Sequence, residues 1–148
     1  MCLIVDANCA VETLCANPSK AFGPVNQALI KKNAVMVMGG TKLRNEYMKL
    51  AAVWRFIVSL DRAGKAVACS DAAVDALQKK LEDSGTLQSD DPHIIALAII
   101  SGARLLCSKD KNLHKDFRSQ KLIKDPRGNV YQKESHKPLI YKCCGGLQ

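Results

Sequence analysis

Two aspartates follow short apolar runs that the sequence predicts to be buried strands. Asp6 comes directly after the apolar run 2–5, and Asp110 comes shortly after the apolar run 104–107. Continuous apolar runs of this length are typical of strands that are covered on both faces of a parallel sheet. Because ligands of open parallel sheets bind at the carboxyl ends of the strands, both aspartates are candidates for chemistry.

Two further acids lie near the starts of predicted helices. Asp91 precedes a proline, and this pair suits the first turn of a helix, where a carboxylate faces the positive end of the helix dipole. Glu46 lies near the start of the helix predicted over residues 41–60, at the boundary of its apolar stripe. A surface ion pair with Lys42 or Lys49 is the simpler explanation of Glu46 when that residue is considered alone.

Brought together, these four carboxylates would select a hard divalent cation. Like charges that are close together repel and raise their own pKa values, so they stay ionised only when a cation lies among them. Oxygen ligands of this kind favour Mg²⁺ or Mn²⁺. Such an ion lowers the pKa of a bound water and stabilises charge on a phosphate group, which is the chemistry of phosphodiester hydrolysis. The acids therefore predict a metal site of the nuclease type.

The charge of the chain is strongly positive, with a net value of +8 over 148 residues. From Lys111 to the carboxyl terminus, nine bases stand against three acids. This imbalance predicts a polyanionic partner or an acidic protein partner, although a solvated surface explains the basic tail equally well. A basic rim would also hold nucleic acid beside acids that would otherwise repel it, so charge and acid placement support the same interpretation.

Predicted strands and helices alternate along most of the chain. This pattern requires right-handed crossovers and predicts a three-layer α/β/α sandwich with a central, mainly parallel sheet. We expect a single domain over residues 1–148, with a basic C-terminal extension from about residue 118. In that extension, residues 130–131 and 139–141 are predicted to be edge strands or extended arms.

No apolar run approaches the roughly 18 residues that a transmembrane helix requires, and the apolar run at the amino terminus is too short for a signal peptide. We therefore expect a cytoplasmic protein with no membrane partner. The seven cysteines are then expected to be reduced thiols, since disulfides are rare in that compartment. Cys143 and Cys144 are half of a zinc-site pattern, but no matching half accompanies them.

Several other polar or aromatic residues have structural explanations that compete with functional ones. His93 is interpreted as a surface histidine of its helix rather than a catalytic base. Asp116 is predicted either to join the metal shell or to lie on the surface. Asn8 is expected to be a helix N-cap, as is Asp90, which is alternatively a further carboxylate beside the metal. Trp54 lies on the apolar stripe and is predicted to pack in the core.

Four segments of the sequence are similar to the PIN-domain family, the fold of VapC-type toxins and related ribonucleases. Together they extend over nearly the whole chain, and they read LIVDANC, GGTKLRNEY, DDPHIIALAIISGARLLCSKD and DPRGNVY. The resemblance implies a metal-dependent endoribonuclease that hydrolyses RNA phosphodiester bonds. It leaves two settings open, the toxin of a type II toxin–antitoxin pair and a housekeeping nuclease. The toxin setting implies a cognate antitoxin protein as a partner beside RNA, and the family resemblance implies a second copy of the chain.

The resemblance also assigns the site residues. The four acidic positions of the family, which bind Mg²⁺ or Mn²⁺ and cleave RNA, correspond to Asp6 in LIVDAN, Glu46 in RNEY, Asp91 before IIALA, and Asp110 in SKD. These four residues are therefore expected to be both catalytic residues and metal ligands. Many relatives have threonine where Ser108 stands, and either residue supplies a hydroxyl that can orient an acid or a water.

Two alternative functions remain from other classes. The first is a non-catalytic RNA- or protein-binding module that kept the fold and lost turnover. Retention of all four acids argues against it, since a degenerate site would tolerate amides or alanine at those positions. The second is a phosphate-handling domain of the receiver type, but the acidic pair and the lysine that such a domain needs are not evident.

Overall fold

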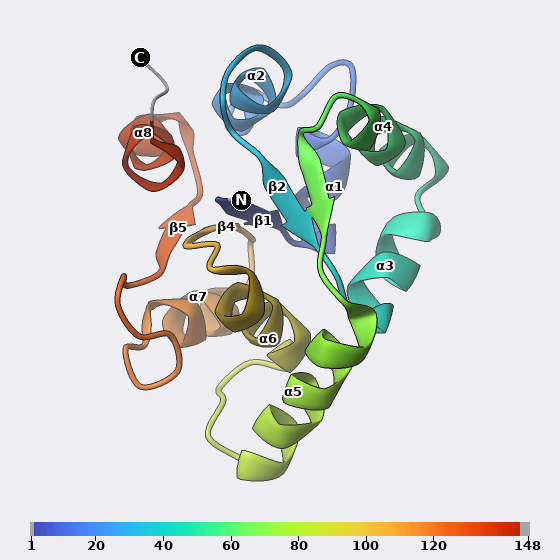
Figure 1. Cartoon of the computed structure of the whole chain (residues 1–148). Coiled ribbons are helices and arrows are strands. Elements are labelled where there is room, and N and C mark those ends of the chain that lie inside the picture. Colours follow the sequence, from blue (N-terminus) through green and yellow to red (C-terminus); the bar gives the residue numbers. More distant parts are fainter. Residues whose placement is uncertain (1, 146–148) are drawn as a thin grey trace.

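Five parallel strands form one central sheet in the computed structural model, which describes residues 2–145. The strands are β1 (Leu3–Val5), β2 (Met36–Met38), β3 (Ala66–Ala68), β4 (Leu105–Cys107) and β5 (Asn129–Tyr131). Their order across the sheet is β3-β2-β1-β4-β5, and every neighbouring pair is parallel. Helices lie on both faces of the sheet (Figure 1), so the predicted three-layer α/β/α sandwich is confirmed.

Eight α-helices and one short 3₁₀-helix accompany the strands in the described part of the chain. They are α1 (Ala7–Thr13), α2 (Gly23–Lys31), α3 (Thr41–Met48), α4 (Ala51–Arg62), α5 (Asp71–Ser84), α6 (Pro92–Ser101), α7 (Lys111–Arg118), η1 (Glu134–His136) and α8 (Lys137–Cys144). Gly102 ends α6 with a φ of 81°, a left-handed conformation that glycine adopts without strain. None of the helices within residues 2–145 is long and apolar enough to cross a bilayer.

The two central strands are buried because their residues are apolar on both faces. Every residue of β1 and of β4 is fully buried. Val5 lies beside Cys107 in the parallel register, and the backbone N–H of Asp6 donates a 2.9 Å hydrogen bond to the carbonyl of Cys107. The backbone therefore holds the carboxyl ends of β1 and β4 side by side, together with the residues that follow them.

The prediction of one helix over residues 41–60 is wrong, because two helices, α3 and α4, occupy this segment. The backbone of Leu50 leaves the helical region, with φ −108° and ψ 87°, and its N–H donates to the carbonyl of Tyr47. Apolar spacing continues across this break, so periodicity alone did not reveal it. Tyr47 is fully buried and its hydroxyl donates to the carbonyl of Val5, which fixes α3, and Glu46 with it, at the end of β1.

The segment after α7 adds an edge strand and a helix to the fold. Residues 130–131 lie in β5, which pairs with β4 at the edge of the sheet, so an edge strand is confirmed there. Residues 139–141 lie in α8, so the edge strand or extended arm predicted for them is wrong. Pro138 in the first turn suits a helix start, and Ile140 supplies the buried contact.

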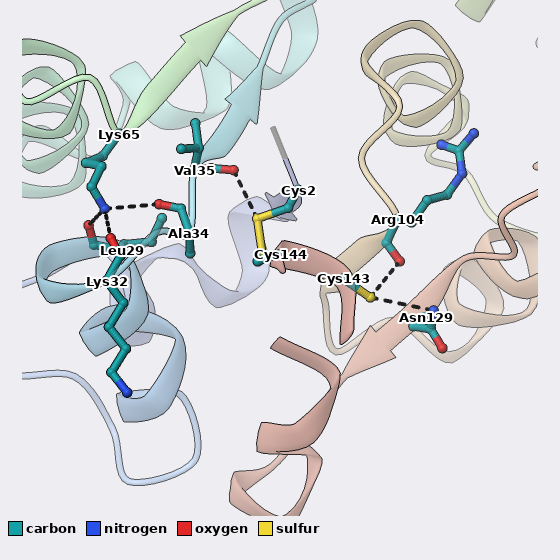
Figure 2. The surroundings of a disulfide bond; sticks show 10 residues. All are labelled: Cys2, Leu29, Lys32, Ala34, Val35, Lys65, Arg104, Asn129, Cys143 and Cys144. Atoms are coloured by element: carbon teal, nitrogen blue, oxygen red, sulfur yellow. Dashed lines mark hydrogen bonds between the residues drawn. A yellow bond between two sulfur atoms is a disulfide. The ribbon is translucent and has the colours of Figure 1, made fainter. Parts of the chain in front are cut away.

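Cys2 and Cys144 form a disulfide between the start of β1 and the end of α8 (Figure 2). Their Cα atoms are 5.1 Å apart, although 142 positions separate them in the sequence. The prediction that all seven cysteines are reduced is therefore wrong. It rested on compartment alone, which treats every cysteine alike, whereas the fold brings these two together. The pairing also removes Cys144 from any zinc site.

Candidate functional site

The carboxyl ends of β1 and β4 lie where the strand order of the sheet changes direction. From β1 the chain continues to β2 and β3 on one side, and from β4 it continues to β5 on the other. At such a point right-handed crossovers send the connecting helices to opposite faces, which leaves the strand ends accessible to ligands. Asp6 follows β1 and Asp110 follows β4 after two residues, so both lie at the position where open sheets bind ligands.

Asp6 is a buried carboxylate, with only 5% of its surface exposed. Its Oδ2 accepts a 2.7 Å hydrogen bond from Ser108 Oγ. Burial raises the pKa of Asp6; the Ser108 hydrogen bond opposes this rise, and the nearby charge of Asp110 adds to it. Asp6 is therefore a carboxylate held in one position, in surroundings that disfavour its charge.

Ser108 connects the two strand ends through its hydroxyl. Besides donating to Asp6, its Oγ accepts hydrogen bonds from the backbone N–H of Asp110 at 3.1 Å and from the side-chain amide of Asn8 at 3.4 Å. One hydrogen and two lone pairs are all that a hydroxyl offers, so Ser108 is saturated. Asn8 lies inside α1 and accepts from the backbone N–H of Lys109, so its prediction as an N-cap is wrong, and the cap position belongs to Asp6.

Asp110 performs a structural task at the same point, because it caps α7. Its Oδ1 accepts hydrogen bonds from the backbone N–H groups of Asn112 at 2.9 Å and Leu113 at 3.3 Å. Such a cap fixes both the start of the helix and the direction of the carboxylate. Sequence reasoning placed Asp110 after a strand but did not identify it as a cap.

Asp91 occupies the N-cap position of α6, but its side chain makes no capping hydrogen bond. Burial raises the pKa of Asp91, and the charges of Asp6 and Asp110 add to the rise, to about 6, although Lys42 opposes it. Lys42 Nζ lies 3.9 Å from Asp91 Oδ1, and both side chains are partly exposed. Asp91 therefore lies close enough to both strand-end aspartates to feel their charge.

Glu46 lies against His93, which the structure buries completely. His93 Nε2 is 3.2 Å from Glu46 Oε1, an ion-pair distance, but the two atoms do not have hydrogen-bond geometry. Within the described residues, both ring nitrogens and Oε1 are buried atoms that lack a hydrogen-bond partner. Burial lowers the pKa of His93 to about 4, so the ring is neutral at pH 7 and the contact is not an ion pair. Burial also raises the pKa of Glu46, and the charge of Asp6 adds to the rise.

The interpretation of His93 as a surface residue is wrong for a reason that the sequence contains. Its exposure is 1%, and the seven residues from Pro92 to Ala98 are all buried. The first two turns of α6 are apolar all round and have no solvent face, as the run IIALA after His93 indicates, and only the end of the helix exposes Ile99 and Ile100. A histidine in its first turn then points into protein, whichever direction it takes.

The four predicted site residues converge on Asp6. Its charge acts on the pKa values of Glu46 and Asp91, and the charge of Asp110 acts on both Asp6 and Asp91. The donor set fits a hard divalent cation, because it consists of carboxylate oxygens that disfavour one another's charge, one of them the unpartnered Glu46 Oε1. As the side chains lie, no three ligating groups of residues 2–145 are close enough together to hold a metal ion. Ion binding would therefore require the carboxylates to move closer together.

The structure also gives the surroundings of three other residues that were interpreted from the sequence. Asp116 is buried and accepts backbone hydrogen bonds from Gln88 and Ser89 at 2.8 to 3.1 Å, so the prediction of a surface position is wrong, whereas a role in the metal shell stays a prediction. Asp90 is not the N-cap of α6, since Asp91 takes that place. Trp54 is half-buried and packs against the core, which agrees with its predicted structural role.

The chain was compared with models of protein families, with curated proteins and with solved structures, and none of the three comparisons gave a match.

Proposed function

We propose that this protein is a metal-dependent endoribonuclease that hydrolyses RNA phosphodiester bonds at the carboxyl ends of β1 and β4. The observation that carries the proposal is the convergence of the other three carboxylates on Asp6, with the pKa values of Asp6, Glu46 and Asp91 raised. Such crowding disfavours the ionised carboxylates unless a cation joins them. A chain of net charge +8 supplies the attraction for RNA that the acids alone would oppose.

The proposed residue roles follow from the contacts of each side chain. Asp6, Glu46, Asp91 and Asp110 would hold Mg²⁺ or Mn²⁺, which when bound supplies a water of lowered pKa and stabilises charge on the phosphate. Ser108 holds Asp6 in place, and the cap on α7 holds Asp110. These two carboxylates are fixed by the fold. Asp91 makes no capping hydrogen bond but is hydrogen-bonded to the side chain of Asp110, and Glu46 Oε1 has no hydrogen-bond partner within the described residues.

In this proposal Lys42 is the cation that would contact the substrate phosphate. Its Nζ lies near Asp91 and 3.4 Å from the backbone carbonyl of Asp90, and its side chain is 44% exposed. Once an ion neutralises Asp91, this ammonium group is free to contact a non-bridging phosphate oxygen. Arg44, the other base of the same helix turn, is paired with Asp71 and is not available for this contact.

One observation favours the alternative function, a non-catalytic RNA- or protein-binding module. No three ligating groups among residues 2–145 are close enough together to hold an ion, as a degenerate site would also show. In that case the basic surface would still bind RNA, but addition of metal would change neither its stability nor the RNA. A cognate antitoxin, a second copy of the chain and a cytoplasmic setting belong to the toxin hypothesis. The Cys2–Cys144 disulfide weighs against a reducing compartment.

The test of the proposed function is cleavage of a mixed RNA panel with Mg²⁺, with Mn²⁺ and with EDTA. Asp6→Asn keeps the size of the side chain and removes its charge, and Asp61→Asn makes the same change on the exposed surface of α4 as a control. We expect wild type and Asp61→Asn to give endonucleolytic products only with metal, and Asp6→Asn to give none. Equal cleavage by Asp6→Asn would show that the acids are not the catalytic site.

Metal binding can be measured without activity through thermal unfolding. A ligand that binds only the folded state at a hundred times its dissociation constant stabilises by about 2.7 kcal/mol. We expect Mn²⁺ to raise the melting temperature of wild type and Asp61→Asn but not of Asp6→Asn. RNA binding without cleavage and without this shift would support the non-catalytic module instead.

A further inference from the structure

A large basic cavity lies beside the carboxyl end of α7. Its volume is about 800 Å³, and it is lined by residues 86 and 88, by Asp116, by residues 118–122 and by Arg127. Three cationic side chains, those of Arg118, Lys121 and Arg127, contribute to the lining. The cavity shares no residue with the acidic cluster on Asp6, so the proposed catalytic chemistry leaves it unexplained.

The cations of this cavity are available to a ligand. Arg118, Lys121 and Arg127 form no ion pair with any residue that the structure describes. Arg127 uses only its Nε, which donates a 3.0 Å hydrogen bond to the carbonyl of Arg118 and leaves the terminal guanidinium nitrogens unengaged. That contact also satisfies a carbonyl at the negative end of α7, where the helix dipole would otherwise repel an anion.

The only acid in the lining is compensated by the backbone. Asp116 receives hydrogen bonds from the N–H groups of Gln88 and Ser89, which share its negative charge. Three full positive charges therefore face one partly neutralised carboxylate and a helix end worth about half a charge. The balance of charge in the cavity favours an anionic ligand.

The polarity of the lining identifies the part of the ligand that it would contact. Leu122 is the only large apolar side chain of the lining, and no aromatic side chain belongs to it. Single-stranded bases are held mainly by stacking on aromatic rings, whereas phosphates are held by arginine, lysine and polar side chains. This cavity has the chemistry for phosphate and lacks a surface on which a base would stack.

Two segments of known length connect the cavity with the acidic cluster. Gln88 lines the cavity and Asp91 belongs to the cluster, so their Cα atoms are at most about 11 Å apart. On the other side, α7 runs from its cap Asp110 in the cluster to Arg118 in the cavity, and its eight residues span about 12 Å. An extended polyanion bound at the cluster therefore reaches the cavity within one short helix length.

From these observations we propose that the cavity of Arg118, Lys121 and Arg127 is a phosphate-binding subsite for single-stranded RNA that extends from the acidic cluster. The proposal rests on the proposed ribonuclease function, because that function places an RNA strand at the cluster. The subsite binds the phosphate backbone of the RNA and does not discriminate between base sequences. It keeps the strand in place while the scissile phosphate lies among the acids.

The experiment compares two triple variants that remove equal charge from two cavities. Arg118→Gln, Lys121→Gln and Arg127→Gln alter the proposed subsite. Lys20→Gln, Lys32→Gln and Lys137→Gln alter a second cavity, of about 470 Å³, between α2 and α8. Binding of a short fluorescein-labelled single-stranded RNA is measured by anisotropy in EDTA over a range of salt concentrations, so that no cleavage interferes.

We expect the subsite triple variant to bind the RNA at least about tenfold more weakly, with the salt slope reduced by about 2 because three phosphate contacts are lost. The control triple variant should stay within about twofold of wild type. With metal present, the subsite variant should show a raised KM and little change in kcat. Equal weakening by both triple variants, or no weakening by the subsite variant, would overturn the proposal. The latter result would indicate an acidic protein as the ligand of this cavity.

A single variant guards against a folding defect and separates this proposal from the proposed function. Lys121 is exposed and makes no contact that the fold needs, so Lys121→Gln should fold normally and reduce the salt slope by about 0.7. An unchanged slope in Lys121→Gln would contradict the subsite. Loss of cleavage in every protein, with the binding difference retained, would refute the nuclease and leave the RNA-binding subsite standing.

Discussion

The two edges of the central sheet differ in how their polar groups are paired. At the carboxyl edge, burial and the charges of neighbouring carboxylates raise the pKa values of Asp6, Glu46 and Asp91, and Glu46 Oε1 has no hydrogen-bond partner among the described residues. At the amino edge, cations and carbonyls are paired, and a disulfide joins the chain. Groups that cost stability are thus concentrated at one edge.

At the amino edge, two long basic side chains donate hydrogen bonds to backbone carbonyls. Lys65 Nζ donates to the carbonyl of Leu29 at 3.0 Å, to that of Ala34 at 3.3 Å, and to that of Lys32, which together close the end of α2 (Figure 2). A cation at a helix carboxyl end also interacts favourably with the helix dipole. Each of these contacts stabilises the fold, and none offers a group to a ligand.

Arg104 does the same for α6. Its guanidinium donates to the carbonyl of Ala98 at 2.7 Å, to that of Ala103 at 3.0 Å and to that of Pro126 at 2.8 Å. The contrast between the edges teaches where function is placed. Proteins concentrate unfavourable polar arrangements at functional sites and compensate for them elsewhere, so the crowded edge is the one to test for chemistry.

The largest expected effect comes from removing one carboxylate charge from the carboxyl edge, which tests whether that edge is the functional one. On the proposed function, Asp91→Asn should lower metal-dependent RNA cleavage by at least about a hundredfold, or roughly 3 kcal/mol of transition-state stabilisation. Asparagine keeps the shape of the side chain and is an equally good N-cap, so α6 should stay intact. Initial rates with Mg²⁺ measure the effect, and Asp61→Asn is the matched control. Undiminished cleavage would remove Asp91 from the site.

A change at the amino edge should affect stability and not activity. Cys2→Ser removes the disulfide to Cys144 and should lower the free energy of unfolding of the oxidised protein by about 2–4 kcal/mol. Cys143→Ser is the control, because Cys143 is adjacent in the chain but has a free thiol. Urea unfolding with and without a dithiol reductant measures both. If reductant leaves the stability of wild type unchanged, the disulfide does not hold α8 in solution.

A smaller effect is expected from the helix-capping lysine of the amino edge. Lys65→Met keeps most of the side-chain volume and removes the charge that three carbonyls share, so unfolding should become easier by about 1–2 kcal/mol. Lys80→Met removes an exposed lysine from α5 that makes no hydrogen bond or ion pair with the described residues, and it should change stability by less than about 0.5 kcal/mol. Equal effects of the two variants would show that the contacts of Lys65 are not what stabilises this edge.

How much of this contrast the sequence revealed depends on the range of each interaction. Apolar runs and helical spacing predicted the strands, and the acids after them could be placed at one edge because parallel strands end together. The break at Leu50 was not predicted, because the apolar spacing continues through it. The helix over residues 139–141 was not predicted either, because a short apolar run does not distinguish helix from strand.

The remaining differences depend on contacts that only the fold creates. Cys2 and Cys144 meet because the fold brings the start of β1 to the end of α8, and no spacing in the sequence encodes that meeting. Asp116 was ambiguous because its partners are backbone N–H groups 27 and 28 residues away. The candidate site was predicted in its four acids, but not in the support that Ser108 gives Asp6 or in the contact between Glu46 and His93.

The last expected effect is a pH dependence of stability in the absence of metal, which arises at the carboxyl edge. The pKa of Asp91 in the folded protein is raised to about 6 from a value of 3.8, so its contribution to stability is complete below pH 3.8 and is lost as the pH rises through 6. Relative to Asp91→Asn, wild type should therefore lose about 1–2 kcal/mol between pH 4 and pH 7 in EDTA, after allowance for the partial exposure of Asp91. Urea unfolding at each pH measures this difference.

Comparison of the two proteins is needed because His93 acts in the opposite direction. Its pKa is lowered to about 4, so its contribution is lost as the pH falls, but it is present in both proteins and cancels. Mn²⁺ should reverse the sign of the difference above pH 6, because an ion stabilises the ionised carboxylate of wild type and finds one ligand fewer in the variant. A difference that does not change with pH in EDTA would mean that Asp91 is not crowded in solution. The contrast between the two edges would then lose its main electrostatic support.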